Sequence, residues 1–158
     1  MDHIGVVDTM FARVDMAAEA MDELRSCDGY GSKFEVVHRT VPGFKDLGVE
    51  CKRLIDLHGC NMVIAIGMAG SAPVDQICAH EASQAIMLAQ LLTNTHVLEV
   101  FVYENEADDP SKLAEICRQR ARKHARNAYW LLYDPDQLAQ RAGQGIRQGA
   151  ADAGPLPA

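Results

Sequence analysis

Two short stretches of the chain carry side chains that could move a proton or bind a polar ligand. VPGFKDL, from Val41 to Leu47, places a lysine and an aspartate directly after a Pro-Gly turn, and CAHEAS, from Cys78 to Ser83, places a histidine beside a glutamate. Histidine titrates near neutral pH, and a glutamate in an apolar setting can accept a proton. Both stretches are therefore candidates for proton transfer or for stabilising a charged intermediate.

Glu81 stands out because of its neighbours on a helical wheel. It falls in the middle of a face whose other members are apolar, namely Ile77, Ala85, Leu88 and Leu92. A carboxylate in such a stripe must be ion-paired, hydrogen-bonded or raised in pKa by desolvation. A salt bridge in the core or at an interface is one interpretation, and proton transfer is the other. His80 lies on the flank of the same stripe, and its two interpretations are a hydrogen-bonded surface or interface residue and a group that transfers a proton.

Several familiar chemistries lose their support because their motifs are missing. There is no GxGxxG after the first apolar run and no GxxxxGK[ST], as dinucleotide and P-loop sites require. There is also no GxSxG elbow and no HExxH helix. No two of the five cysteines lie closer than nine residues, so they are interpreted as reduced thiols rather than as a zinc or redox site.

Charge and composition restrict the partners and the location. A net charge of −7 makes a nucleic-acid backbone a poor partner, and the basic run at residues 118–126 is interpreted as a solvated helix face. No apolar stretch approaches the length needed to cross a bilayer, so no membrane partner is expected. The N-terminus carries no recognisable secretion signal, which predicts a cytoplasmic protein.

Strand and helix patterns alternate along the chain, which predicts an α/β fold with a four-stranded parallel sheet and helices on both faces. Residues 1–142 should form one domain, and residues 143–158 a tail that is flexible or packed on a neighbouring subunit. The expected strands are 3–8, 34–40, 61–68 and 97–103. The expected helices lie within 9–27, then at 47–58, about 73–93, 110–133 and, weakly, 135–142.

Parallel sheets of this kind bind ligands at the carboxyl ends of their strands. Those ends are predicted at residues 8–13, 40–46, 67–75 and 103–108, so VPGFKDL lies on the binding edge. Aromatic side chains there offer stacking surfaces for a flat heterocycle, and glycines let backbone amides approach it. The edge also carries charged side chains, namely Arg13, Lys45 and Glu104.

Five segments taken together resemble the archaeal type of riboflavin synthase, and the resemblance covers essentially the whole chain. They are VVDTMFARVDMA, RTVPGFKDLGVECKRL, AIGMAGSAPVDQICAHEAS, AQLLTNTHVLEVFVYENEA and GIRQGAADAGP. VPGFKDL is also similar to the VPGxxE[IL] turn of lumazine synthases. The resemblance implies a flavodoxin-like three-layer fold and a homopentamer with sites between subunits. It implies the dismutation of two 6,7-dimethyl-8-ribityllumazine molecules, with a divalent cation such as Mg²⁺ and no redox cofactor.

Such a reaction needs two flat rings held in register, a base for a weakly acidic ring methyl and donors for developing negative charge. We assign proton transfer to His80 and Glu81, and charge stabilisation to Arg13 and Lys45. The metal ligands cannot be named from the sequence. The residues expected to bind the substrate are Phe11, Ala12, Thr40, Val41, Pro42, Gly43, Phe44, Asp46, Gly67, Met68, Ala69, Gly70 and Tyr103.

The chain departs from lumazine synthases in two respects. Their pattern places a histidine early in the helix after the third strand, where this chain has Pro73 or Val74, and their phosphate-binding arginine has no clear counterpart. A phosphate-free pair of lumazines therefore fits better than a phosphorylated four-carbon substrate. A lumazine synthase and a non-catalytic lumazine or flavin carrier remain alternatives. A flavodoxin-like electron carrier would need a phosphate loop rich in Ser and Thr, which TMFARV is not.

Overall fold

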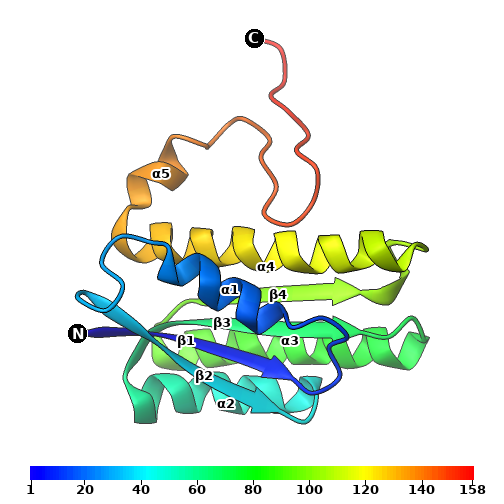
Figure 1. Cartoon of the computed structure of the whole chain (residues 1–158), viewed down its shortest axis with the longest axis horizontal. Coiled ribbons are helices and arrows are strands. Elements are labelled where there is room, and N and C mark those ends of the chain that lie inside the picture. The colour runs from blue at the N-terminus through cyan, green and yellow to red at the C-terminus, as the bar shows by residue number, and fades with distance from the viewer.

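The computed structural model describes residues 1–158, and its centre is one parallel sheet of four strands. The strand order is β2-β1-β3-β4 (Figure 1). The strands are β1 (Asp2–Thr9), β2 (Phe34–Val41), β3 (Cys60–Ala69) and β4 (Val97–Tyr103). The central β3 is buried over almost its whole length, as its unbroken apolar run predicts.

Helices cover both faces of the sheet, so the predicted three-layer α/β/α architecture is confirmed. Helices α1 (Met16–Arg25) and α4 (Pro110–Tyr133) lie on one face, and α2 (Phe44–His58) and α3 (Pro73–Thr93) lie on the other (Figure 1). Each face has its own apolar core. Phe34, Met62 and Ile64 belong to the core under α1 and α4, whereas Leu47, Leu54 and Ile86 belong to the other.

Local sequence explains where most of the helices begin and end. The Asp15 carboxylate accepts a hydrogen bond from the Ala18 N–H at 2.9 Å and caps α1, and the Asp109 carboxylate accepts one from the Ser111 N–H and caps α4. Gly59 ends α2 in the left-handed conformation, with φ 66°. Helix α1 occupies only part of the predicted segment 9–27, because residues 10–15 form a loop at the edge of the sheet.

Helix α3 has apolar residues on two sides. The side that packs on the sheet and α2 consists of small residues and one isoleucine, namely Ala79, Ala82, Ile86 and Ala89. The opposite side exposes large apolar residues, including Leu91, which is 82% exposed, and also Val74, Ile77, Met87, Leu88 and Leu92. We call this second side the outer apolar face of α3. None of the helices combines the length and apolar character needed to span a membrane.

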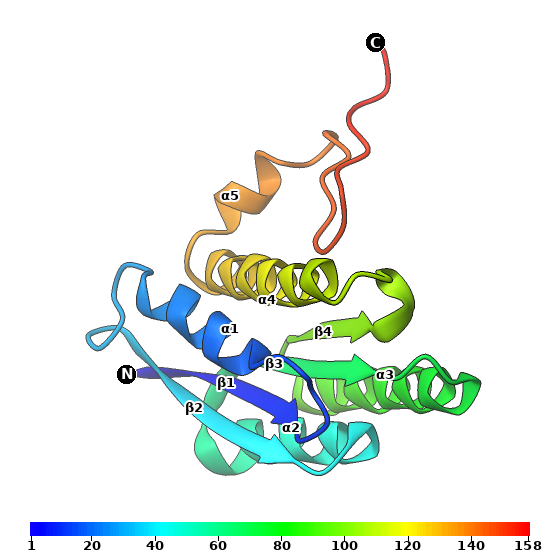
Figure 2. The ribbon, with the colours of Figure 1, turned by 45° about the vertical axis from the view of Figure 1, so that its right-hand side comes forward.

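The chain ends on the far side of α4 from the sheet. The short helix α5 (Pro135–Ala139) follows α4, and residues 140–158 form a loop and a final segment that extends from the body (Figures 1 and 2). Arg120 holds the loop by donating from Nε to the Gly149 carbonyl at 2.9 Å. The last residues make no such contact, and Leu156 is exposed.

Candidate functional site at the carboxyl edge of the sheet

The four strands end close together, which brings their following loops onto one edge. In the ladder, Thr9 of β1 lies opposite Val41 of β2, and Ala69 of β3 lies opposite Tyr103 of β4. The Met10 N–H extends the pairing by donating to the Val41 carbonyl at 3.0 Å. The segments predicted to bind a ligand therefore share this carboxyl edge, where open parallel sheets place their sites.

A cavity of about 130 Å³ opens at this edge between the end of β1, the start of α2 and the start of α3. We call it the edge cavity. Five of the residues expected to bind a substrate line it: Phe11, Gly43, Phe44, Met68 and Gly70. Three further lining residues were not among the expected ones: Thr9, Asp75 and Cys78. The edge cavity thus combines aromatic rings with a hydroxyl, a carboxylate and a thiol.

Thr9 is the most informative of the three. Its side chain is 3% exposed, and its Oγ1 is the one buried side-chain polar atom that has no hydrogen-bond partner. Burying a hydroxyl without a partner costs about 1–3 kcal/mol, so buried polar groups are normally paired. An orphaned hydroxyl that lines a cavity is explained when a bound molecule supplies the partner.

Asp75 lies across the edge cavity from the β3 loop. A side chain at Gly70 would collide with the Asp75 carboxylate, so only glycine at position 70 allows the carboxylate to approach the backbone this closely. Asp75 belongs to the first turn of α3, where the free backbone N–H groups favour negative charge. It is the one titratable carboxylate among the residues that line this cavity.

VPGFKDL is partly helical, because helix α2 starts three residues earlier than the predicted residue 47. Helix α2 already begins at Phe44, and the Asp46 carboxylate accepts a hydrogen bond from the Gly43 N–H at 3.1 Å. Asp46 is therefore committed to capping the helix. The Phe44 ring lies over Gly67 and packs edge-on against Phe101, with the ring centroids 4.7 Å apart. Gly67 thus makes room for an aromatic ring of the protein rather than for a ligand.

Arg13 lies on the other side of the same edge. Its Nη1 is 3.0 Å from Glu104 Oε1, and its backbone N–H donates to Met68 Sδ at 3.4 Å. These residues line a second cavity of about 490 Å³ between the β1 loop, the β4 end and the start of α4. Met68 lines both cavities.

Lys45, His80 and Glu81 lie on the outside of α2 and α3 and do not line the edge cavity. Lys45 Nζ is 3.0 Å from Glu81 Oε2, with 65% of the lysine and 50% of the glutamate side chain exposed. The hydrogen bond to Glu81 raises the pKa of Lys45 above its ordinary value. His80 Nε2 is 3.3 Å from the Gln84 amide nitrogen. Of the interpretations open for Glu81, the ion pair is the one observed.

Two side chains at β4, Glu99 and Tyr103, have raised pKa values. Burial raises the pKa of Glu99, although a hydrogen bond from Ser83 and the nearby His80 act in the opposite direction. Burial also raises the pKa of Tyr103, and the charges of Glu99 and Glu106 add to this effect. No sequence pattern distinguishes Glu99, because one acidic residue on an edge strand is ordinary.

The other residues that were expected to bind the substrate lie at the carboxyl edge but do not line the edge cavity. The Thr40 hydroxyl donates to Asp8 at 2.6 Å, and the same carboxylate oxygen is 3.0 Å from His38 Nε2. Gly67 and Ala69 are buried in β3, Val41 is buried at the end of β2, Pro42 is exposed, and Ala12 and Tyr103 are partly buried. No three His, Cys, Asp or Glu side chains lie close enough together to bind a metal ion.

The chain is similar to known proteins over most of its length. Residues 2–133 match the family described as 6,7-dimethyl-8-ribityllumazine synthase. The riboflavin synthase of Methanothermobacter thermautotrophicus is 51% identical over 156 residues, which cover 99% of this chain and 100% of the relative. The riboflavin synthase of Aeropyrum pernix is 43% identical and that of Archaeoglobus fulgidus 40% identical, each with 97% of both chains covered.

One solved structure is similar only at a low level. The molybdopterin biosynthesis enzyme MoaB from Thermus thermophilus matches with a TM-score of 0.48 and 20% identity, over 90% of this chain and 98% of its own, and this likeness carries no argument about function. The sequence matches are decisive because they extend over nearly the full length. The chain belongs to the 6,7-dimethyl-8-ribityllumazine synthase family.

Proposed function

We propose that the chain is a riboflavin synthase of the archaeal type. It would convert two molecules of 6,7-dimethyl-8-ribityllumazine into riboflavin and 5-amino-6-(ribitylamino)uracil by transfer of a four-carbon unit. The observation that carries this proposal is the 40–51% identity to riboflavin synthases over essentially the whole chain. The edge cavity supports it, because aromatic rings and an unpartnered hydroxyl suit a flat heterocycle with polar edges.

We propose that the complete site lies between two subunits of a cyclic homo-oligomer, with the pentamer as the expected form. An edge cavity of about 130 Å³ is small beside the roughly 300–1,000 Å³ of ordinary ligand pockets. Two lumazines therefore need walls from a neighbouring copy. The outer apolar face of α3 supports association, since exposed apolar patches of this kind commonly mark interfaces. The end of β4 and the tail at residues 143–158 are the proposed donors of those walls.

Within the site, the main demand is that two rings be held face to face. Orientation of this kind can lower a barrier by about 7–11 kcal/mol. We assign ring stacking to Phe11, and ring carbonyl binding to the backbone at Met68 and Gly70. The Thr9 hydroxyl would donate to, or accept from, a polar atom of the ring or its ribityl chain. Each of these groups lines the edge cavity.

The reaction also needs a group that removes a proton from the ring methyl. We propose the Asp75 carboxylate, because it lines the edge cavity, whereas His80 and Glu81 do not. The proton would pass to the carboxylate, and the electron pair would be delocalised into the ring. His80 and Glu81 remain the alternative that a neighbouring copy would bring to the site. Arg13 and Lys45 are the proposed cations for the developing negative charge.

The family resemblance also implies a divalent cation such as Mg²⁺, but the residues of one chain do not fit a dedicated metal site. No three His, Cys, Asp or Glu side chains lie together. Mg²⁺ commonly keeps several waters and uses only one or two carboxylates together with the substrate. We therefore assign no step to it and treat activation by Mg²⁺ as a separate proposal.

An absorbance assay with lumazine as the sole substrate tests the proposed function. We expect one riboflavin to form for every two lumazines consumed, and stimulation by Mg²⁺ that a chelator reverses. The family match favours lumazine synthase as a second candidate. That enzyme would make lumazine from its two precursors and would leave lumazine alone unconsumed. Tight binding of lumazine with no turnover in either direction would identify a carrier and contradict both proposals.

A further inference from the structure

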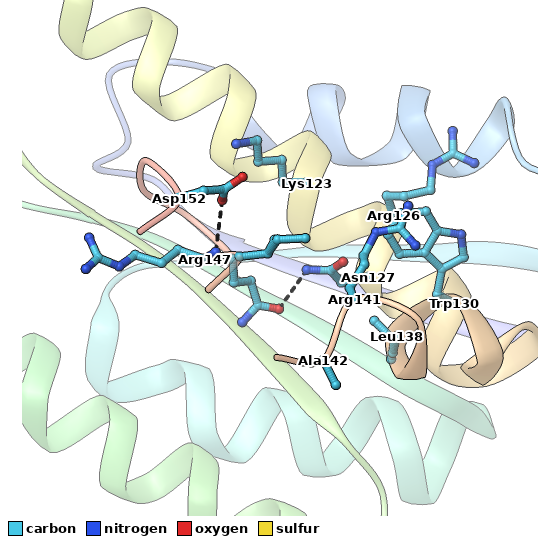
Figure 3. A pocket seen from close by; sticks show the side chains of 11 residues that line it. Lys123, Arg126, Asn127, Trp130, Leu138, Arg141, Ala142, Arg147 and Asp152 are labelled. Carbon is cyan, nitrogen blue, oxygen red and sulfur yellow. Dashed lines mark hydrogen bonds between the residues drawn. The ribbon is translucent and has the colours of Figure 1, made fainter. Parts of the chain in front are cut away.

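A third cavity, distinct from the one beside Arg13, has a volume of about 490 Å³. It lies on the opposite side of α4 from the sheet, away from the loops of the carboxyl edge. Its walls come from the second half of α4, from α5 and from the tail (Figure 3). The polar and aromatic side chains that matter are Lys123, Asn127, Trp130, Arg141, Arg147 and Asp152. We call this space the tail cavity. The lining residues that precede the tail, from Lys123 to Ala142, have no role in the proposed reaction.

Specific hydrogen bonds hold the tail residues that form one wall of the tail cavity. The Ala153 N–H donates to the Gly145 carbonyl at 2.8 Å, and the Arg147 N–H donates to Asp152 Oδ1 at 3.0 Å, so residues 145–153 close into a loop. The Asn127 amide on α4 donates to Gln148 Oε1 at 3.2 Å. Together with the bond from Arg120 to the tail, these contacts form a defined wall rather than a loose segment.

The basic residues of α4 are mostly neutralised within the chain. Arg118 and Arg122 pair with Glu19, Arg126 pairs with Glu23, and Arg120 pairs with Glu106. This result supports the interpretation of residues 118–126 as a helix face rather than a nucleic-acid site. Lys123 is the one Lys or Arg of that run without a carboxylate partner.

The cations that remain unpaired gather at the tail cavity. Of the fifteen Lys and Arg side chains, six make no ion pair, namely Lys33, Arg39, Lys112, Lys123, Arg141 and Arg147. Three of these six line this one cavity. Asp152 is the only acidic side chain among the lining residues, so the cavity is electropositive in a chain of net charge −7.

An apolar wall stands beside these cations. The Arg141 guanidinium lies 4.1 Å from the centre of the Trp130 ring and donates to the Gln137 carbonyl at 2.7 Å, which fixes its position. Leu138 and Ile146 continue the apolar lining. Figure 3 shows Lys123 and Arg141 on different sides of Asn127, while the Arg147 guanidinium extends outward at the opposite end from Trp130.

We propose that the tail cavity binds an organic phosphate with a flat aromatic ring, the chemistry of a nucleotide. The phosphate would lie between Lys123 and Arg141, and the ring would pack on the apolar wall beside Trp130. A free inorganic phosphate fills only a small part of about 490 Å³ and uses none of that wall. The amides of Asn127 and Gln148 supply donors and acceptors for the polar edge of a ring. The two proposed phosphate contacts, Lys123 and Arg141, take no part in the proposed riboflavin synthase reaction.

Fluorescence of Trp130 provides a direct test, because it is the only tryptophan of the chain. Titration of the full-length protein with adenosine 5′-monophosphate should change the emission saturably, and the affinity should fall as salt is added. Arg141→Gln and Lys123→Gln should each weaken the apparent affinity about tenfold or more, because each removes a charge-assisted hydrogen bond. Lys112→Gln is the matched control: it removes an unpaired lysine of the same helix that does not line the cavity, and the affinity should not change.

Three results with adenosine 5′-monophosphate or adenosine would overturn the proposal. They are the absence of a saturable change, an affinity that Arg141→Gln and Lys123→Gln both leave unaltered, and adenosine binding as tightly as its phosphate. Saturable binding of inorganic phosphate with equal affinity would also contradict the need for a ring. Riboflavin formation by the Arg141→Gln variant should equal that of the unmodified protein, so this test stands whether or not the chain proves to be a riboflavin synthase.

Discussion

At the scale of single residues, the edge cavity depends on a hydroxyl that has no partner in the protein. Replacing Thr9 with valine keeps the shape of the side chain and removes that buried polar atom. We expect the unfolding temperature to stay the same or rise, since an orphaned hydroxyl costs free energy. The KM for lumazine should rise about threefold to tenfold, as for the loss of one hydrogen bond.

Thr9→Ser retains the hydroxyl and is the control for this substitution. Its KM should stay close to that of the unmodified protein even if its stability falls slightly. Identical KM values for Thr9→Val and the unmodified protein would show that Thr9 does not contact the substrate.

The proposed proton acceptor can be separated from its alternatives by three variants. Asp75→Asn keeps the size of the side chain but cannot accept the proton, so kcat should fall by roughly 100-fold or more. His80→Ala and Glu81→Gln should keep most of the turnover, because neither side chain lines the edge cavity. Single-turnover absorbance measurements with lumazine distinguish loss of chemistry from loss of binding. Full activity of Asp75→Asn, with loss in either of the other two, would place proton transfer at a subunit interface.

The sequence located the site region better than its individual residues. The strand ends follow from alternating and continuous apolar runs, so Phe11, Gly43 and Met68 could be placed at one edge from the sequence alone. Thr9 and Asp75 lie within the same predicted strand ends, but their roles could not be predicted, because each role depends on which way the side chain points across the edge. Asp75 resembles an ordinary acidic residue in the first turn of a helix, and Thr9 resembles the last residue of a strand.

At the scale of elements, helix α3 shows that the periodicity of apolar residues does not identify which side of a helix is buried. Its apolar stripe at Ile77, Leu88 and Leu92 is visible in the sequence, but it lies on the exposed side. The side that packs inward is formed largely by Ala79, Ala82 and Ala89. Ala85 is exposed, yet α3 approaches α2 so closely there that the Ala85 methyl would collide with any side chain at Gly48. Hydrophobic spacing alone does not distinguish a core from an interface.

Arg120 connects three elements and should control acid stability. Its guanidinium forms a bidentate pair with Glu106, donates to the Phe101 carbonyl of β4 and holds the tail, with 13% of its side chain and 26% of that of Glu106 exposed. Burial by itself raises the pKa of Glu106, but the hydrogen bonds from Arg120 and the Tyr103 N–H outweigh it, so this pKa lies below its ordinary value of 4.5. The ionised pair therefore stabilises the fold above pH 4.5, and this contribution is lost as the pH falls through the lowered pKa.

Arg120→Gln should lower the free energy of unfolding at neutral pH by about 1–3 kcal/mol, a range discounted for partial exposure. The loss should shrink as the pH falls below 4.5, where Glu106 becomes protonated in both proteins. Arg118→Gln is the matched control, because its pair with Glu19 spans 3.7 Å on an exposed surface and should contribute little. Urea unfolding at several pH values measures both; a loss that does not vary with pH would contradict this account.

At the scale of the whole molecule, the outer apolar face of α3 predicts association. Leu88→Glu places a charge in the centre of that face, where the leucine is exposed in one chain. We expect the variant to keep its helical circular dichroism but to sediment as a smaller species, and to lose riboflavin formation with it. Leu88→Met, which keeps the face apolar, should leave both the mass and the activity unchanged. A Leu88→Glu protein of full mass would place the interface elsewhere.

The thiols of the chain differ in burial, and the least buried one, Cys78, can report whether the edge cavity is occupied. Burial raises the pKa of four cysteines, to about 12 for Cys51 and about 11 for Cys60, with smaller increases for Cys27 and Cys117. A buried thiol of high pKa reacts slowly with alkylating agents. Cys78 is partly exposed and opens into the edge cavity. Mild alkylation followed by peptide mass mapping should modify Cys78 first, and saturating lumazine should shield it, so occupancy could be followed without any dye or substitution.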